Sequence, residues 1–229
     1  MNAHREEELL DAVVPTTAIR VGPRPGTAVP TTAGFRSADH PHLDRVQNSI
    51  SGICAALAGM SLVAITALTV TEVVMRGLLD RPLGWNVGFV EQYLMMAMAF
   101  FGIVTAYRTG AHIAVSTLHG RLPGPAQKLT ILLGQLVIAV ALGWLLVAGV
   151  DSVAFSSSTG EQPVPGSADL PWPSWLWKSI MPLAAVLGLV VVLIDLYREL
   201  SSPWSAPSTD HAPGDVEREA AVSGGDDGR

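Results

Sequence analysis

The stretch Ile50–Val70, ISGICAALAGMSLVAITALTV, decides the fold, because none of its residues is charged and most are apolar. A helix needs about 20 such residues to cross the hydrocarbon core of a bilayer. In lipid a helix satisfies its own backbone hydrogen bonds, which a lone strand cannot do. The stretch therefore predicts a membrane-spanning helix.

Three further stretches have the same character, and together with the first they predict an all-α membrane protein of four transmembrane helices. The expected spans are residues 48–75, 87–107, 129–150 and 175–197. Short connections join them, so neighbouring spans are expected to run in opposite directions. The internal repeat typical of self-sufficient secondary transporters is not visible in the sequence.

Charged residues make up 15% of the 229-residue chain, against about 25% in a usual soluble domain. They crowd the two ends, which predicts a membrane domain at residues 46–198 between polar tails. The tails, residues 1–45 and 199–229, are expected to be disordered because they are rich in small and polar residues and proline. The net charge of −6, without a basic stripe, argues against nucleic-acid binding.

The lysines and arginines near the ends of the spans predict the orientation. One side of the membrane would hold Arg36, Arg45, Arg108, Arg121, Lys128 and Arg198, and the other Arg76, Arg81 and Lys178. Because cytoplasmic loops carry the excess of positive charge, both termini are predicted to be cytoplasmic. Trp85, Trp172, Trp175 and Trp177 would then form an aromatic belt at the outer surface.

The sequence offers no catalytic, cofactor-binding or metal-binding residue, so an enzyme is not expected. A haem anchor needs histidines inside the spans, yet all six lie outside them: His4, His40, His42, His112, His119 and His211. The single cysteine, Cys54, cannot build a disulfide or a zinc site. A stand-alone four-helix protein, either a small transporter or a redox anchor, remains the alternative to an accessory membrane subunit.

Three polar residues in or near the spans need an explanation. Glu72 and Arg76 are four residues apart in the order that favours a helical ion pair, and they fit an anchor at the membrane surface. Glu91 lies about one turn inside the second span. Ionisable groups in spans are functional candidates, but Glu91 is shallow enough to reach the surface, so both interpretations stay open.

Small residues recur four apart in every span, for example Gly102 and Ala106 in the second. In lipid such faces let helices approach closely. They fit packing among the four spans, docking to a partner, or both.

The stretch from Glu72 to Pro123 resembles the small permease subunits of TRAP (tripartite ATP-independent periplasmic) transporters. It shows, in the family's order, Glu-Val with a following Arg, Pro-Leu with a Trp, an acidic residue with Tyr-Leu, a Phe-Leu-Gly type element (here Phe-Phe-Gly), Arg, a His-Ile/Val-x-Val motif and Leu-Pro. The matching residues are Glu72, Val73, Arg76, Pro82, Leu83, Trp85, Glu91, Tyr93, Leu94, Phe100, Phe101, Gly102, Arg108, His112, Ile113, Val115, Leu122 and Pro123. Many family members have Asp where this chain has Ser116, so a role of that carboxylate is in doubt here.

This resemblance implies a multi-pass protein of the bacterial inner membrane that scaffolds a large permease subunit. An extracytoplasmic solute-binding protein would deliver the substrate, and sodium symport would drive uptake of organic acids such as C4-dicarboxylates. The residues expected to serve the structure or the partner interface are Glu72, Arg76, Trp85, Glu91, Tyr93, Gly102, Arg108 and His112. The partners are then the large subunit, the binding protein and the lipid bilayer, with no cofactor.

Overall fold

The computed structural model describes residues 20–23, 28–31, 33–37, 40–109, 122–162, 172–204 and 209–212. In this part of the chain four helical stretches are long and apolar enough to cross a membrane. They are Pro41–Leu79, Asn86–Thr109, Pro125–Thr159 and Trp175–Ser201. The prediction of an all-α membrane protein with four spans is thereby confirmed.

Two of the four spans are not single continuous α-helices. Their bounds are α2 Pro41–Leu79, α3 Asn86–Phe89, the π-helix η1 Val90–Leu94, α4 Met95–Thr109, α6 Gly124–Thr159, α7 Trp175–Lys178 and α8 Ile180–Ser201. The second span is thus α3, η1 and α4 in continuation, and the fourth is α7 followed by α8. α2 begins at Pro41 and α8 ends at Ser201, while the limits of the membrane domain at residues 46 and 198 stay a prediction.

Local sequence explains where the long helices begin and end. Pro41 and Pro125 stand in the first turns of α2 and α6, where the missing N–H has no helical partner in any case. Asp80 and Gly160 follow these helices in the left-handed conformation, which stops a helix. With 39 and 36 residues at about 1.5 Å per residue, both helices exceed the bilayer core, so they tilt or protrude.

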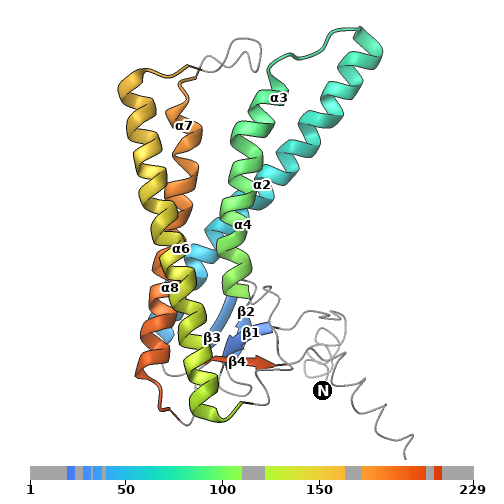
Figure 1. Ribbon diagram of the computed structural model, residues 1–229. Coiled ribbons are helices and arrows are strands. Elements are labelled where there is room, and N and C mark those ends of the chain that lie inside the picture. Colours follow the sequence, from blue (N-terminus) through green and yellow to red (C-terminus); the bar gives the residue numbers. More distant parts are fainter. Residues whose placement is uncertain are drawn as a thin grey trace, which may run out of the picture.

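The four spans form a row in the order α2, α4, α8, α6, in which each helix packs chiefly against the next. α2 and α6 lie at the two edges of this row, and α2 also touches α8. In Figure 1 the upper part of α2 leans away from α6 and α7. We call the end near Pro41, Thr109 and Ser201 the tail end, and the end near Leu79 and Trp175 the loop end.

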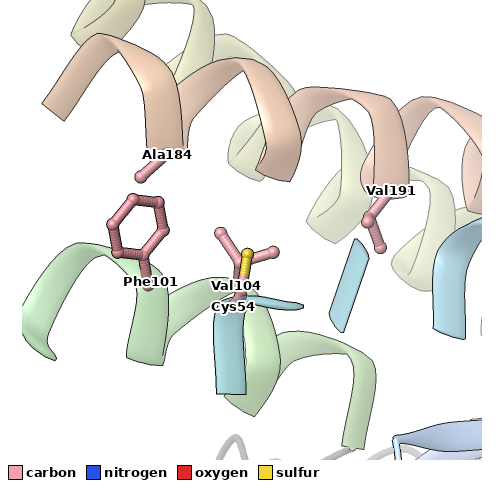
Figure 2. Close-up of a cluster of buried hydrophobic side chains, with 5 residues drawn as sticks. All are labelled: Cys54, Phe101, Val104, Ala184 and Val191. Atoms are coloured by element: carbon pink, nitrogen blue, oxygen red, sulfur yellow. The ribbon is translucent and has the colours of Figure 1, made fainter. Parts of the chain in front are cut away.

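The apolar core lies where α2, α4 and α8 meet. It consists of Cys54, Phe101, Val104, Ala184 and Val191. Figure 2 shows Ala184 of α8 opposite the Phe101 ring of α4, with Cys54 of α2 beside Val104. The buried Cys54 thus acts as a small apolar side chain.

The third span, α6, is held to α8 by a close contact at Gly149. A Cβ atom at Gly149 would lie 2.9 Å from Cδ of Pro182. Such a distance is shorter than real side chains allow, so only glycine permits this approach.

Short strands lie at the tail end, within the two tails. β1 (Arg20–Pro23) pairs antiparallel with β4 (Thr209–Ala212), and β2 (Ala28–Thr31) with β3 (Gly34–Ser37). The composition predicted disorder here, and it could not reveal that β3 packs against α2. For the parts of the tails outside the described residues, disorder stays a prediction.

Candidate functional site

The main polar site is a buried cluster at the tail end, centred on Asp44 near the start of α2. Its Oδ2 accepts hydrogen bonds from the backbone N and the Oγ of Ser37, both at 2.6 Å. Its Oδ1 accepts from Nη2 of Arg108 at 2.9 Å and from Nη1 of Arg198 at 2.7 Å. A buried carboxylate needs such partners, because each one replaces a lost interaction with water.

Arg108, near the end of α4, binds three parts of the structure at once. Its Nε and Nη2 each donate to Oδ1 of Asn48 at 3.2 Å, and Nη2 also donates to the carbonyl oxygen of Phe35 at 3.3 Å. Nη1 lies 3.5 Å from Oδ1 of Asp195 on α8. The guanidinium carbon stands 3.7 Å above the centre of the Phe35 ring, a cation–π contact.

Two further contacts bring α8 into the cluster. Nε2 of Gln47 donates to Oδ1 of Asp195 at 2.7 Å and to the carbonyl oxygen of Val191 at 2.9 Å. Nη2 of Arg198 donates to Oγ of Ser37 at 2.8 Å. We call Asp44, Arg108, Asp195 and Arg198 the charge cluster.

The charge cluster links α2, α4, α8 and β3, and its two acidic and two basic side chains balance. Removing one member of such a group leaves a buried charge without its partner, which is strongly destabilising. The β2–β3 turn lies directly against it: a Cβ atom at Gly34 would stand 2.6 Å from Oδ1 of Asn48. The arrangement therefore fixes the positions of three helices at the tail end.

At the loop end, aromatic rings join the second span to the segment before α7. We call Trp85, Phe89, Tyr93 and Trp172 the aromatic group. Phe89 and Tyr93 stack with ring centres 5.4 Å apart. Trp172 meets both rings edge-on, at 5.9 Å from Phe89 and 5.7 Å from Tyr93. Edge-on and stacked pairs of this kind contribute beyond their buried area.

An ion pair adds a second link at the loop end. Nζ of Lys178 on α7 lies 2.5 Å from Oε2 of Glu161, just after α6. The hydrogen bond from Lys178 lowers the pKa of the Glu161 carboxyl, since it stabilises the ionised form. The pair fixes the end of α6 to the start of the fourth span.

Replacing Trp172 with alanine is expected to lower the free energy of unfolding by about 1–3 kcal/mol, because two ring contacts are lost. Thermal unfolding of the detergent-solubilised protein, followed by circular dichroism, measures the change. Trp175→Ala is the matched control, since none of the aromatic contacts found in the described residues involves that ring. Equal effects of the two substitutions would contradict a role of the aromatic group.

The predicted site residues do not lie together in the structure. Nη2 of Arg76 and Oε1 of Glu72 form the expected ion pair at 3.0 Å, and Oε2 of Glu72 accepts a hydrogen bond from the backbone N of Leu83 at 2.9 Å. Trp85 and Tyr93 belong to the aromatic group, and Arg108 to the charge cluster. Glu91 is exposed, and no atom would meet a Cβ at Gly102 within 4 Å. His112 lies outside the described residues.

Sequence reasoning missed most of the polar residues at the tail end. They are Ser37, Asp44, Gln47, Asn48, Asp195 and Arg198. A signal was present: Asp44, Gln47 and Asn48 share one helical face just before the first long apolar run, and Asp195 and Arg198 are three residues apart at the end of the last. Residues three or four apart are neighbours on a helix surface.

Across the described ranges, no three or more His, Cys, Asp or Glu side chains form a group that could hold a metal ion. The charge cluster contains only two carboxylates: both arginines donate to Asp44, and Gln47 donates to Asp195, which lies 3.5 Å from Nη1 of Arg108. Its ion pairs and hydrogen bonds are suited to holding the helices in place.

Residues 65–202 match the family described as "Tripartite ATP-independent periplasmic transporters, DctQ component". The matched region is more than half of the chain and runs from the middle of α2 to the end of α8. No curated protein and no solved structure matches the chain.

Proposed function

Because the chain belongs to the DctQ family, the small permease components of TRAP transporters, we propose that it scaffolds the large permease subunit during sodium-driven uptake. The substrate would be an organic acid, such as a C4-dicarboxylate, delivered by a solute-binding protein. The family match confirms the resemblance found in the sequence. It also confirms that the chain is not an enzyme, since the family consists of transporter components.

The observation that carries the scaffold proposal is that the row of helices is fastened at both ends. The charge cluster joins α2, α4 and α8 at the tail end, and Asp44 and Arg108 are almost completely enclosed there. The aromatic group and the Glu161–Lys178 pair act at the loop end. A subunit against which a moving partner works needs helices that keep their relative positions.

The edge helix α2 offers a large surface to a partner. From Leu62 to Leu79 none of its side chains is buried, and Val63, Val73 and Leu78 are 68%, 66% and 80% exposed. Only lipid or another membrane protein can cover such a surface in a bilayer.

The proposed location is the bacterial inner membrane, with the tail end in the cytoplasm. The support is the excess of lysine and arginine at the tail end, which includes Arg45, Lys128 and Arg198, since cytoplasmic segments carry this excess. The loop end would then face the solute-binding protein.

Uptake by reconstituted liposomes tests the proposal. Liposomes that contain this chain with its large permease subunit, supplied with the binding protein and an inward sodium gradient, are expected to accumulate a radiolabelled C4-dicarboxylate. Liposomes that lack this chain should show little uptake, and this chain alone none. Full uptake by the large subunit without this chain would overturn the scaffold role. Accumulation by this chain alone would show a self-sufficient transporter instead.

A further inference from the structure

The second span carries an outward stripe of exposed side chains along its whole length. Val87, Met95 and Ile103 are 52%, 49% and 49% exposed. Glu91 and Ala99 are exposed as well and complete the spacing of four. We call Val87, Glu91, Met95, Ala99 and Ile103 the outward stripe. The opposite face of α4 holds the buried Phe101, Val104 and Arg108, so the stripe points away from the core.

The aromatic group explains why Glu91 faces outward. Phe89 and Tyr93 are both turned toward Trp172. Glu91 lies midway between them in the sequence, and two residues along a helix amount to roughly half a turn. η1, which contains Glu91 and Tyr93, has the π-helical form that recurs at functional sites in helices.

The Glu91 carboxylate has no hydrogen bond or ion pair with any residue that the structure describes, whereas Glu72 and Glu161 at the loop end each have one. Two cations at the loop end are already engaged: Arg76 pairs with Glu72, and Lys178 with Glu161. Ionisable side chains in membrane spans usually pair with each other or face protein. Glu91 therefore has the charge and the exposure that a cationic partner requires.

The part of the outward stripe beyond Glu91 is suited to packing against another transmembrane helix. Met95, Ala99 and Ile103 continue it toward the tail end without a charge. Ala99 is small, and the space around Gly102 on α4 is open, since no atom would lie within 4 Å of a Cβ there. Small residues let helices approach closely in lipid.

We propose that the outward stripe docks a transmembrane helix of the large permease subunit, and that a lysine or arginine of that helix pairs with Glu91. This rests on the proposed function, because it takes the large subunit as the partner. The pairing fixes the register of the two helices, and the apolar part of the stripe supplies the packing.

Photo-cross-linking and charge reversal in the co-expressed complex test this pairing. A photoreactive benzoylphenylalanine at Met95 is expected to cross-link to the large subunit. The same group at Val147 on α6, which is 59% exposed, is the control and should not. Glu91→Lys is expected to reduce the large subunit co-purified with this chain about tenfold, since like charges then meet in a desolvated contact. Asp151→Lys, the same reversal at an exposed site on α6, should leave the yield unchanged.

The outcomes separate this proposal from the function on which it rests. If the wild-type chain recovers the large subunit but Met95 cross-links only to lipid or to a second copy of this chain, the stripe is not the interface and the scaffold role stands. Unchanged recovery with Glu91→Lys, in variants inserted as well as the wild type, refutes the ion pair. Failure of the wild-type chain to recover any large subunit overturns both proposals.

Discussion

Replacing Arg108 with alanine is expected to lower the free energy of unfolding by about 3–5 kcal/mol, because a buried ion network then loses its central cation. Asp44 would keep Arg198 and the Phe35 carbonyl would keep Nδ2 of Asn48, but Oδ1 of Asn48 would lose its donor. Asp195 would lose its cation 3.5 Å away. The tail end of α4 would no longer be fixed to α2 and α8. Thermal unfolding in detergent and the yield of membrane-inserted protein measure the loss.

Two further variants make the result specific. Arg45→Ala removes an exposed arginine next to Asp44 and is expected to change stability by no more than about 0.5 kcal/mol. Arg108→Lys keeps the charge but offers a single point of donation in place of the planar fork, so its stability should fall between the wild type and Arg108→Ala. If Arg108→Ala unfolds at the same temperature as Arg45→Ala, the charge cluster does not fix the helices.

Gly149→Leu is expected to destabilise the protein by about 2–3 kcal/mol through overpacking between α6 and α8. A Cβ at this position would lie 2.9 Å from Cδ and 3.1 Å from Cβ of Pro182. The proline ring cannot rotate aside, so the two helices must separate. Since α6 packs chiefly against α8, this separation would weaken its main attachment to the row. Thermal unfolding of the solubilised variant provides the measurement.

Gly143→Leu is the matched control for this substitution. Gly143 stands on the same helix, and no atom would lie within 4 Å of a Cβ there. Equal losses from the two substitutions would show that glycine matters for the helix itself and not for the contact with Pro182. A large loss at Gly149 alone would support the contact.

The contacts at the tail end of the row are expected to contribute more to stability than the contacts at the loop end. The charge cluster is buried and depends on every partner, so single substitutions there should unfold or splay the tail end. The aromatic group contributes smaller, separable amounts, and Trp172 itself is 44% exposed. A scaffold built this way would be firm at the tail end and more adaptable at the loop end.

The sequence by itself determined the four spans, because crossing a bilayer is a local requirement. Each span needs only its own apolar length and its own backbone hydrogen bonds. The Glu72–Arg76 pair was predictable for the same reason, since both residues lie on one helix, four apart. The resemblance from Glu72 to Pro123 identified Arg108 as a candidate but said nothing of its contacts.

Only the tertiary structure decided which polar groups meet. Asp44 and Arg198 are far apart in the chain, and their pairing depends on the start of α2 and the end of α8 lying at the same level. The β2–β3 strands come from a tail whose composition predicts disorder, yet Ser37 and Phe35 complete the charge cluster. Phe89 and Tyr93 pack against Trp172 on one side of the second span, so Glu91, which lies between them in the sequence, faces the other side. Hydropathy can be read from residues that are neighbours in the sequence. The partners of a buried charge instead come from the segments that the fold places beside it.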